Sequence, residues 1–355
     1  MAMSWRYLCV AAALTVATLI TSCAGGPDSG EITVACGATE DWCAANTAAF
    51  TQQTGINASY VRLSSGETVA RLKAGRASPE FDVWHGGPAD GYVAAADQGL
   101  LQPYVSPNAS QIRPAWKAAN GAWTGVYVGA LGFCSNRKVL AGKGLPTPTS
   151  WADLLNPRYA GNISLAHPAT SGTGYTTLWT QVTLAGGDQN KALSYEAALR
   201  RNVLAFTKSG IGPVAQVGRG EVATGIVFSH DCVAAREEGY SDLEVTFPRE
   251  GTGYEVGGVA VIRGARNPAG ASAYVDWALG APAQQIGPTV KSYQVPTNPV
   301  AKVPEQAVRL ETLKLINYDF AASGAAKPEL VRRFDTEVVP APTSRGGSDG
   351  SNPPR

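Results

Sequence analysis

Two short segments rich in serine and glycine have the composition of anion-binding sites. Residues 171–176 (Ser-Gly-Thr-Gly-Tyr-Thr) lie between a predicted strand and a predicted helix, and residues 64–67 (Ser-Ser-Gly-Glu) open another predicted helix. Glycines let the backbone approach an anion, free amides at a helix start carry partial positive charge, and hydroxyls add donors. We expect them to grip a phosphate or phosphonate without a lysine; the alternative is simple caps and turns. The candidate ligand-binding residues of the two segments are Ser64, Ser65, Gly66, Glu67, Ser171, Gly172, Thr173, Gly174 and Tyr175.

A second polar site follows the predicted strand at residues 224–228. His230 and Asp231 stand side by side there and can exchange hydrogen bonds with neighbouring sugar hydroxyls. Glu255, at the start of a later predicted strand, provides a third polar contact, and His85 follows a short strand nearer the N-terminus. All four are candidate ligand-binding residues. The alternatives are structural roles for the histidines and a hinge salt bridge for Glu255.

An enzyme is the competing interpretation of these side chains. Ser171, His230 and Asp231 supply the residue types of a nucleophilic triad. However, adjacent residues on a strand point to opposite faces, so Asp231 is not expected to orient the ring of His230. The chain has no Gly-x-Ser-x-Gly elbow between a predicted strand and a predicted helix, and no Gly-x-x-x-x-Gly-Lys-Ser/Thr loop. We expect no catalysis, no cofactor and no metal. A structural or adhesive surface protein, which would have no cleft, is the third class.

The N-terminus has the pattern of an export signal. Arg6 precedes about 13 apolar residues, fewer than the roughly 20 that span a bilayer. Residues 20–23 (Ile-Thr-Ser-Cys) resemble a bacterial lipobox, so we expect a signal peptide at 1–22, a lipid on Cys23 and a flexible tether at 23–30. This predicts a protein anchored to the membrane on its outer side. The alternative is an ordinary signal peptide with a cysteine near its cleavage site.

Export changes the interpretation of the four remaining cysteines. An even number of cysteines outside the cytoplasm predicts two disulfides. Cys36 and Cys43 flank the first loop, whereas Cys134 and Cys232 lie at the ends of two predicted strands that can be neighbours. We predict the bonds Cys36–Cys43 and Cys134–Cys232; four buried thiols are the alternative. Zinc is disfavoured because no Cys-x-x-Cys or His-x-x-x-His spacing occurs.

Length and composition limit the class of protein. The 355 residues are 44% apolar and 16% charged, which is typical of a well-buried globular chain long enough for two lobes. The net charge of +1 provides no basic field for nucleic acid. Residues 339–355 are rich in Pro, Gly and Ser, and we expect a disordered tail there.

Strands and helices are expected to alternate along the chain, which is typical of an α/β protein with parallel strands. The expected strands are at residues 31–36, 56–63, 82–84, 125–134, 162–166, 224–228 and 254–262. The expected helices are at residues 42–54, 64–73, 90–99, 151–155, 176–185, 269–279 and 310–316.

Four segments together resemble a known family. Residues 64–104, 146–155 (PTPTSWADLL), 170–175 (TSGTGY) and 253–271 (GYEVGGVAVIRGARNPAGA) are similar to type 2 periplasmic solute-binding proteins of ABC transporters. The similarity covers about residues 31–338 and is strongest to the branch that binds ferric ion, hexose phosphates and aminoethylphosphonate. Each motif alone is only moderately specific, but their order and spacing are more so.

The resemblance implies two α/β lobes joined by two crossover strands, near residues 126–133 and 255–262. The first lobe would combine residues 31–128 and 260–338, and the second would take residues 129–259. A small anionic solute would bind in the cleft between the lobes. The permease and ATPase of the importer would be separate chains, and the binding protein itself would be a monomer.

The resemblance also bears on the solute. Hexose-phosphate binders of this branch line the sugar pocket with a His-Asp pair and a later Glu, which His230, Asp231 and Glu255 match. Iron binders use adjacent tyrosines, and no Tyr-Tyr dipeptide occurs here. Aminoethylphosphonate stays open because Glu255 or Asp231 can pair with an ammonium group. Further residues expected near the cleft are Asp41, Trp42, Tyr127 and His167.

Overall fold

The computed structural model describes residues 30–339 of the chain. The expected signal peptide at 1–22, Cys23 with its tether up to residue 29, and the expected tail from residue 340 onward lie outside the described residues. No helix within the described part is long and apolar enough to cross a membrane.

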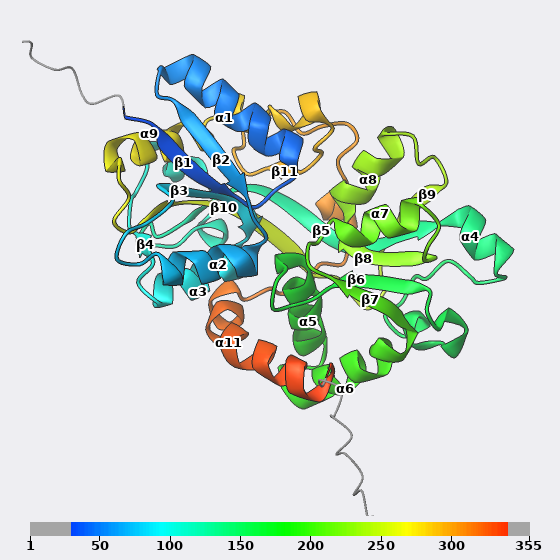
Figure 1. Cartoon of the computed structure of the whole chain (residues 1–355). Helices are drawn as coiled ribbons and strands as arrows, with labels where there is room; N and C mark the ends of the chain where they lie inside the picture. The colour runs from blue at the N-terminus through cyan, green and yellow to red at the C-terminus, as the bar shows by residue number, and fades with distance from the viewer. Residues whose placement is uncertain (1–29, 340–355) are drawn as a thin grey trace, which may run out of the picture.

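Within residues 30–339, eleven strands form one mixed sheet that runs through both halves of the molecule (Figure 1). Its main path follows the order β2-β1-β3-β10-β5-β8-β6-β7, and the short strands β4, β11 and β9 pair with β10 or β5. The strands are β1 (Ile32–Cys36), β2 (Ala58–Arg62), β3 (Val83–Pro88), β4 (Leu101–Gln102), β5 (Thr124–Asn136), β6 (Ile163–Ala166), β7 (Val203–Thr207), β8 (Thr224–Phe228), β9 (Leu243–Thr246), β10 (Tyr254–Ile262) and β11 (Val295–Pro296).

The first lobe is built on β1, β2 and β3, which are parallel because helices connect them. Helix α1 ends at Gly55, which adopts the left-handed conformation (φ 75°) that glycine tolerates best. The helices of this lobe are α1 (Glu40–Thr54), α2 (Ser65–Ala74), α3 (Ala89–Asp97), α9 (Pro268–Ala278) and α10 (Ala281–Gln284).

The second lobe is built on β6, β7 and β8, which are also parallel, with β9 on the neighbouring strand β5. Its helices are α4 (Arg137–Gly142), α5 (Gly172–Leu184), α6 (Gln189–Leu199), α7 (Gly212–Gly218) and α8 (Ser229–Glu237). The expected helix at residues 151–155 is a turn followed by a 3-10 segment, Asp153–Leu155.

Two long strands connect the lobes, as expected. Every residue of β5 is buried, and β5 pairs antiparallel with β10 in the first lobe and with β8 in the second. Representative partners are Val128 with Val256 and Leu131 with Phe228. Because β5 and β10 run between the lobes, residues of these strands form the floor between them.

The C-terminal segment differs from the expectation. The predicted helix at 310–316 is wrong, since only Leu310–Thr312 forms a 3-10 turn. A long helix that was not predicted, α11 (Phe320–Glu337), packs against α3 and also contacts α6 and α5. Its Gly324 and Pro328 interrupt a helical pattern in the sequence. Gly324 is needed because a β-carbon there would lie 2.5 Å from the side chain of Val93 on α3.

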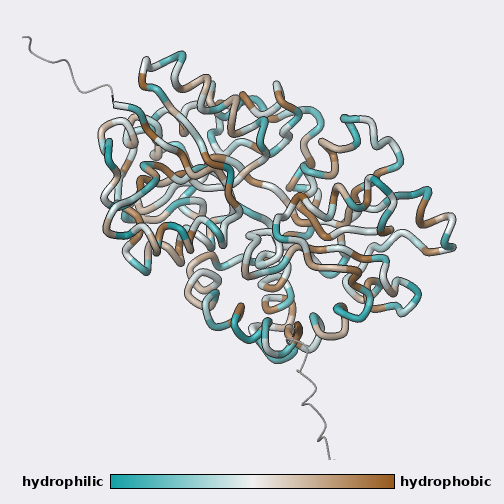
Figure 2. The backbone as a smooth tube through the Cα atoms, in the orientation of Figure 1, coloured by the Kyte–Doolittle hydropathy of each residue, from teal (hydrophilic) through white to brown (hydrophobic). Residues whose placement is uncertain are grey.

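The hydrophobic core is continuous between the two halves. One cluster includes Trp84 and Tyr92 of the first lobe, whose rings stack with centroids 3.9 Å apart, together with Leu178 of α5 and Phe334 of α11. Separate clusters lie under α1 and α9 and around β6 and β8. Figure 2 shows hydrophobic residues concentrated along the central strands and hydrophilic ones in the outer loops and helices.

Both predicted disulfides are confirmed. Cys36 at the end of β1 is bonded to Cys43 in the first turns of α1, and Cys134 of β5 is bonded to Cys232. The position of Cys232 corrects one expectation, because this residue lies in helix α8 and not at the end of a strand.

Candidate ligand-binding site

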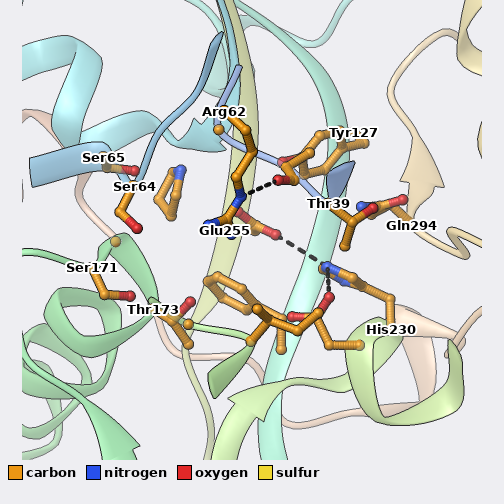
Figure 3. A pocket seen from close by; sticks show the side chains of 18 residues that line it. Thr39, Arg62, Ser64, Ser65, Tyr127, Ser171, Thr173, His230, Glu255 and Gln294 are labelled. Carbon is orange, nitrogen blue, oxygen red and sulfur yellow. Dashed lines mark hydrogen bonds and ion pairs between the residues drawn. The ribbon is translucent and has the colours of Figure 1, made fainter. Parts of the chain in front are cut away.

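A polar pocket lies between the two lobes, above β5 and β10 (Figure 3). Both lobes contribute side chains to it, and the floor is formed by Tyr127 of β5 and Glu255 of β10. The residues that line it are Gly37, Ala38, Thr39, Arg62, Ser64, Ser65, Pro88, Tyr127, Ser171, Gly172, Thr173, Gly210, Ile211, Phe228, His230, Asp231, Glu255 and Gln294.

Six helices of the described part of the chain begin at this pocket. In each case the N-cap residue itself lines the cavity; these residues are Thr39 (α1), Ser64 (α2), Pro88 (α3), Ser171 (α5), Ile211 (α7) and Phe228 (α8). In each lobe the parallel strands direct the following helices to the same edge of the sheet, and the helix starts of both lobes meet at the pocket. Each helix start carries partial positive charge and amides without an intrahelical acceptor. The pocket therefore has the electrostatics of an anion site.

Hydroxyl groups add donors at the same edge. Within the described chain, the N-cap residues Thr39 and Ser64 make no side-chain capping hydrogen bond, so their hydroxyls are available to a ligand. Ser171 accepts from the amide of Gly174 at 3.4 Å, which is a long contact. Figure 3 shows Ser64, Ser65, Ser171 and Thr173 gathered on one side of the cavity.

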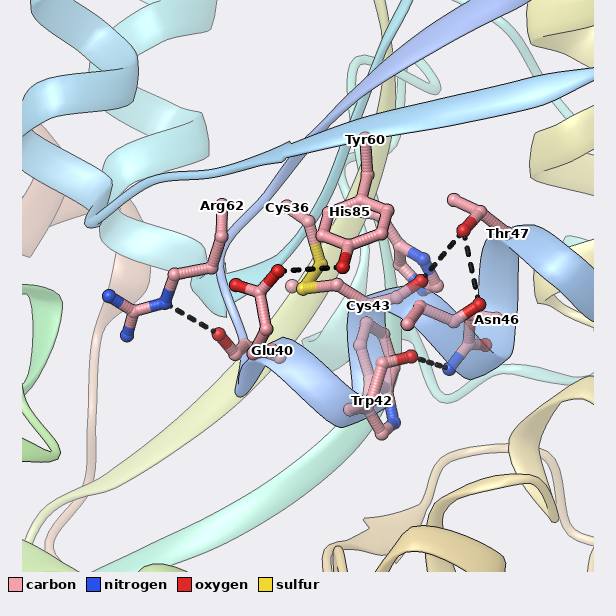
Figure 4. Close-up of a disulfide and its surroundings, with 12 residues drawn as sticks. Cys36, Glu40, Trp42, Cys43, Asn46, Thr47, Tyr60, Arg62 and His85 are labelled. Carbon is pink, nitrogen blue, oxygen red and sulfur yellow. Dashed lines mark hydrogen bonds between the residues drawn. A yellow bond between two sulfur atoms is a disulfide. The ribbon is translucent and has the colours of Figure 1, made fainter.

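Arg62 is the only lysine or arginine among the described residues that line the pocket. It ends β2, and its Nε donates to the carbonyl oxygen of Ala38 at 3.1 Å, which directs the guanidinium toward the cavity (Figures 3 and 4). The loop that carries Ala38 is held by the Cys36–Cys43 disulfide. The sequence analysis missed Arg62, although its place at the carboxyl end of a predicted strand was a usable signal.

The opposite side of the cavity holds three titratable side chains. The Nε2 atom of His230 lies 3.6 Å from Oδ1 of Asp231 and 3.6 Å from Oε1 of Glu255, and all three groups are largely buried. Burial raises the pKa of Glu255 well above its usual range, and Asp231 and Asp90 add to this effect. Burial also raises the pKa of Asp231 and lowers the pKa of His230. These shifts favour a neutral imidazole and a protonated Glu255, which can donate as well as accept.

The geometry of this group corrects an argument from the sequence. His230 and Asp231 lie in the first turn of α8, not at the end of a strand, so the alternation of a strand does not separate them. The ring of His230 is stacked on Phe228 at 13°, with the ring centroids 5.8 Å apart. Its Nδ1 is buried and has no hydrogen-bond partner in the described part of the chain. The Nδ1 atom faces Gly129 of β5, whereas Nε2 faces Asp231 and Glu255.

The predicted site residues divide into two groups. Those that line the pocket are Ser64, Ser65, Ser171, Gly172, Thr173, His230, Asp231 and Glu255. Those that lie outside its lining are Gly66, Glu67, His85, Gly174 and Tyr175.

Each of the five residues outside the lining has a packing role or faces solvent. Glu67 is exposed, and the hydroxyl of Tyr175 donates to the carbonyl oxygen of Ser323 at 2.6 Å in the core. His85 is 3.0 Å from the hydroxyl of Tyr274 and belongs to a neighbouring cavity. For Gly174, a β-carbon would lie 2.3 Å from the carbonyl oxygen of Ala166. For Gly66 it would lie 2.1 Å from that of Ala169.

Several lining residues were not among the main predictions. Tyr127, which was expected near the cleft, lines the pocket, and its hydroxyl accepts from the amide of Gly87 at 3.0 Å. Residues missed altogether include Thr39, Gly210 and Gln294. Thr39 follows the first strand. It could have been found in the same way as Ser65, because residues after the carboxyl ends of parallel strands line such sites. Gln294 comes from a loop with no recognisable pattern.

The chain is similar to proteins of known class. Residues 78–323 match the family model described as bacterial extracellular solute-binding protein. An uncharacterized protein of Haemophilus influenzae is 38% identical over 339 residues, 93% of this chain and 97% of the relative. The spermidine/putrescine-binding periplasmic protein 1 of the same organism is 28% identical over 65% of this chain and 66% of its own length.

Solved structures extend the comparison. The periplasmic binding protein AfuA of Actinobacillus pleuropneumoniae, with fructose-6-phosphate bound, is 37% identical with a TM-score of 0.85, over 88% of this chain and 99% of AfuA. The periplasmic binding protein P5PA is 31% identical with a TM-score of 0.83, over 87% of this chain and 99% of P5PA. A ferric binding protein of Campylobacter jejuni, 17% identical over 86% of this chain and 98% of its own, shares the fold with a TM-score of 0.73.

These similarities confirm the two-lobed type 2 fold and the branch that the sequence motifs indicated. The relatives are solute-binding proteins and not enzymes, and they act outside the cytoplasm. The chain belongs to the family of bacterial extracellular solute-binding proteins, in which it is a periplasmic-type binding protein of the ABC-transporter class.

Proposed function

We propose that the protein captures a hexose phosphate in the pocket between its lobes and delivers it to the permease of an ABC importer. One observation carries this proposal: six helix N-termini and Arg62 converge on a cavity whose other side holds His230, Asp231 and Glu255. The helix N-termini and Arg62 suit a phosphate, and the three titratable side chains suit sugar hydroxyls. A molecule that carries both a phosphate and a sugar therefore fits the pocket best.

The phosphate end would lie between the N-termini of α2 and α5. Ser65 and Gly172 approach each other there, because a β-carbon on Gly172 would stand 2.9 Å from Oγ of Ser65. The hydroxyls of Ser65, Ser171 and Thr173 would donate to phosphate oxygens, and Arg62 would add a charge-assisted hydrogen bond. This assignment of roles rests on the positions of the side chains in the lining.

The sugar end would lie against the first turn of α8. Asp231 accepts from hydroxyl groups, neutral His230 can donate or accept, and protonated Glu255 supplies a donor without adding negative charge near the phosphate. Gln294 and Tyr127 line the same side. The bound fructose-6-phosphate of AfuA, a protein 37% identical to this one, supports this class of solute.

Other solutes of the fold fit the pocket less well. Within residues 30–339, no cluster of three or more His, Cys, Asp or Glu side chains is arranged to hold a metal ion, and the ferric binding proteins share the fold alone. Polyamines, named for more distant relatives, are polycations that six helix N-termini and Arg62 would repel. Aminoethylphosphonate is the second candidate, because its phosphonate suits the α2–α5 side and Asp231 can accept from its ammonium.

The remaining expectations belong to the same proposal. Residues 31–128 with 260–338 would form one moving unit and residues 129–259 the other. Cys23 would carry a lipid that anchors a monomer outside the cytoplasmic membrane. Mass spectrometry of the membrane-extracted protein would test the lipid.

A calorimetric titration of the purified mature protein tests the solute. The panel is glucose 6-phosphate, fructose 6-phosphate, free glucose, inorganic phosphate, aminoethylphosphonate, spermidine and ferric citrate. We expect at least one hexose phosphate to bind more than tenfold tighter than free glucose or inorganic phosphate. Binding of ferric iron or spermidine without any phosphorylated compound would refute the proposal.

A further inference from the structure

The two lobes touch directly at the edge of the pocket, through the N-termini of α2 and α5. The amide of Gly66, in the first turn of α2, donates to the carbonyl oxygen of Thr170 just before α5, at 3.0 Å. Gly66 belongs to the first lobe and Thr170 to the second, so this main-chain hydrogen bond crosses the cleft. Its neighbours in the sequence, Ser65 and Ser171, both line the pocket.

Two glycines permit this approach, one from each lobe. A β-carbon on Gly66 would lie 2.1 Å from the carbonyl oxygen of Ala169 and 2.9 Å from Cα of Thr170. A β-carbon on Gly172 would lie 2.5 Å from Cδ of Pro88 and 2.9 Å from Oγ of Ser65. Most of these obstacles are backbone or ring atoms, which cannot swing away like the end of a flexible side chain.

The backbone itself does not require glycine at either position. Neither Gly66 nor Gly172 is among the glycines with positive φ. Both lie in the first turn of a helix, where alanine is the better helix former. The close approach of the two lobes is therefore what favours glycine here.

We propose that Gly66 and Gly172 are positioning residues that set the width of the anion site. They let the N-termini of α2 and α5 approach until Ser65 and Ser171 reach one tetrahedral oxyanion from opposite sides. A side chain at either position pushes the two helix starts apart, so the hydroxyls and amides no longer grip the same anion. The inference rests on the proposed function, since it assigns the phosphate group to this contact.

The test compares the variants Gly66→Ala and Gly172→Ala with Gly142→Ala. Gly142 lies in α4, outside the pocket lining, has no positive φ, and no atom within 4 Å of its added β-carbon, so it is a matched control. We expect both site variants to bind fructose 6-phosphate and inorganic phosphate at least tenfold more weakly, by a similar factor for each. Gly142→Ala should bind both like the wild type.

A second-site change separates positioning from general damage. Because Cδ of Pro88 is the nearest obstacle at Gly172, the double variant Gly172→Ala/Pro88→Ala makes room for the methyl group. In the Pro88→Ala background, we expect Gly172→Ala to cost at most half of the binding free energy that it costs in the wild type. The thermal midpoint of each unliganded variant should stay within a few degrees of the wild type.

The outcomes distinguish this inference from the proposed function. If the wild type binds inorganic phosphate but no hexose phosphate, the proposed solute is wrong. The role of the two glycines is then tested by the affinity of their variants for inorganic phosphate. Wild-type affinity in Gly66→Ala and Gly172→Ala overturns the inference. So does a loss of affinity that only parallels a large fall in the thermal midpoint and is not rescued by Pro88→Ala.

Discussion

The ring of His230 lies directly against Gly129 of β5. A β-carbon on Gly129 would stand 2.5 Å from Nδ1 and 2.7 Å from Cε1 of His230, and 3.5 Å from Oε1 of Glu255. The crossover strand therefore lacks a side chain at the point where the imidazole and the carboxyl group meet. This vacancy lets His230 lie over the floor of the pocket with its Nδ1 free of partners in the described chain.

Gly129→Ala tests that relationship. The added methyl group must displace the ring of His230, so we expect hexose-phosphate affinity to fall by about 1–3 kcal/mol, the range for a lost buried hydrogen bond. Affinity for inorganic phosphate should change by less than twofold, because the α2–α5 side is untouched. Calorimetry of both ligands checks this, and equal losses for the two would contradict it.

Arg62 should contribute to every anionic solute. We expect Arg62→Gln to weaken binding of hexose phosphate and of inorganic phosphate by about 1.5–3 kcal/mol, the range for hydrogen bonds to charged groups. The dependence of the affinity on salt should also decrease. Arg71→Gln is the control, because Arg71 pairs with Glu80 outside the pocket. If the two variants behaved alike, Arg62 would have no place in the site.

Asp231 should discriminate between sugars and simple anions. Its side chain is 12% exposed and close to His230, so Asp231→Ala removes an acceptor for a sugar hydroxyl. We expect a loss of roughly 1–3 kcal/mol for hexose phosphate and little change, or a small gain, for inorganic phosphate. Isothermal titration with both ligands measures the difference. Unchanged hexose-phosphate affinity would remove Asp231 from the sugar end.

Glu196 predicts a pH dependence of stability that is independent of the ligand. It lies on α6, is 2% exposed, and burial raises its pKa to about 8. In the unfolded chain the pKa of this carboxyl group is the ordinary 4.5, whereas in the folded protein it is about 8, so the folded protein keeps the proton to a higher pH. The free energy of unfolding should therefore fall as the pH rises through this window.

Glu196→Gln should remove that slope. At pH 8 the variant should be more stable than the wild type by roughly 1–3 kcal/mol, and at pH 4.5 the difference should shrink. Urea denaturation at the two pH values measures it, with the exposed Glu311→Gln as the control. A difference that stays constant between pH 4.5 and 8 would mean that the carboxyl group is not held protonated.

The strand-end rule explains what the sequence analysis found. Ser65, Ser171 and His230 all lie a few residues after the end of a strand, and the carboxyl ends of parallel strands meet at one edge of a sheet. The disulfides were predictable because Cys36 and Cys43 are close in sequence, which leaves Cys134 and Cys232 as the other pair. These inferences needed local patterns only.

The errors came from contacts that local patterns do not encode. Gly66 and Gly174 match the composition of an anion loop. However, glycine is required at these two positions because the backbone passes close to the carbonyl oxygens of Ala169 and Ala166, respectively. The start of α8 was misread because the helix follows β8 without a linker. Helix α11 was missed because Gly324 and Pro328 interrupt its pattern, whereas packing on α3 stabilises it.

The structure of the protein with fructose 6-phosphate bound tests the central claim most directly. The account predicts the phosphorus atom between the N-termini of α2 and α5, with Ser65, Ser171 and Arg62 within hydrogen-bond distance of its oxygens, and the sugar hydroxyls on His230 and Asp231. A phosphate bound elsewhere, or a sugar with no contact to α8, would contradict it.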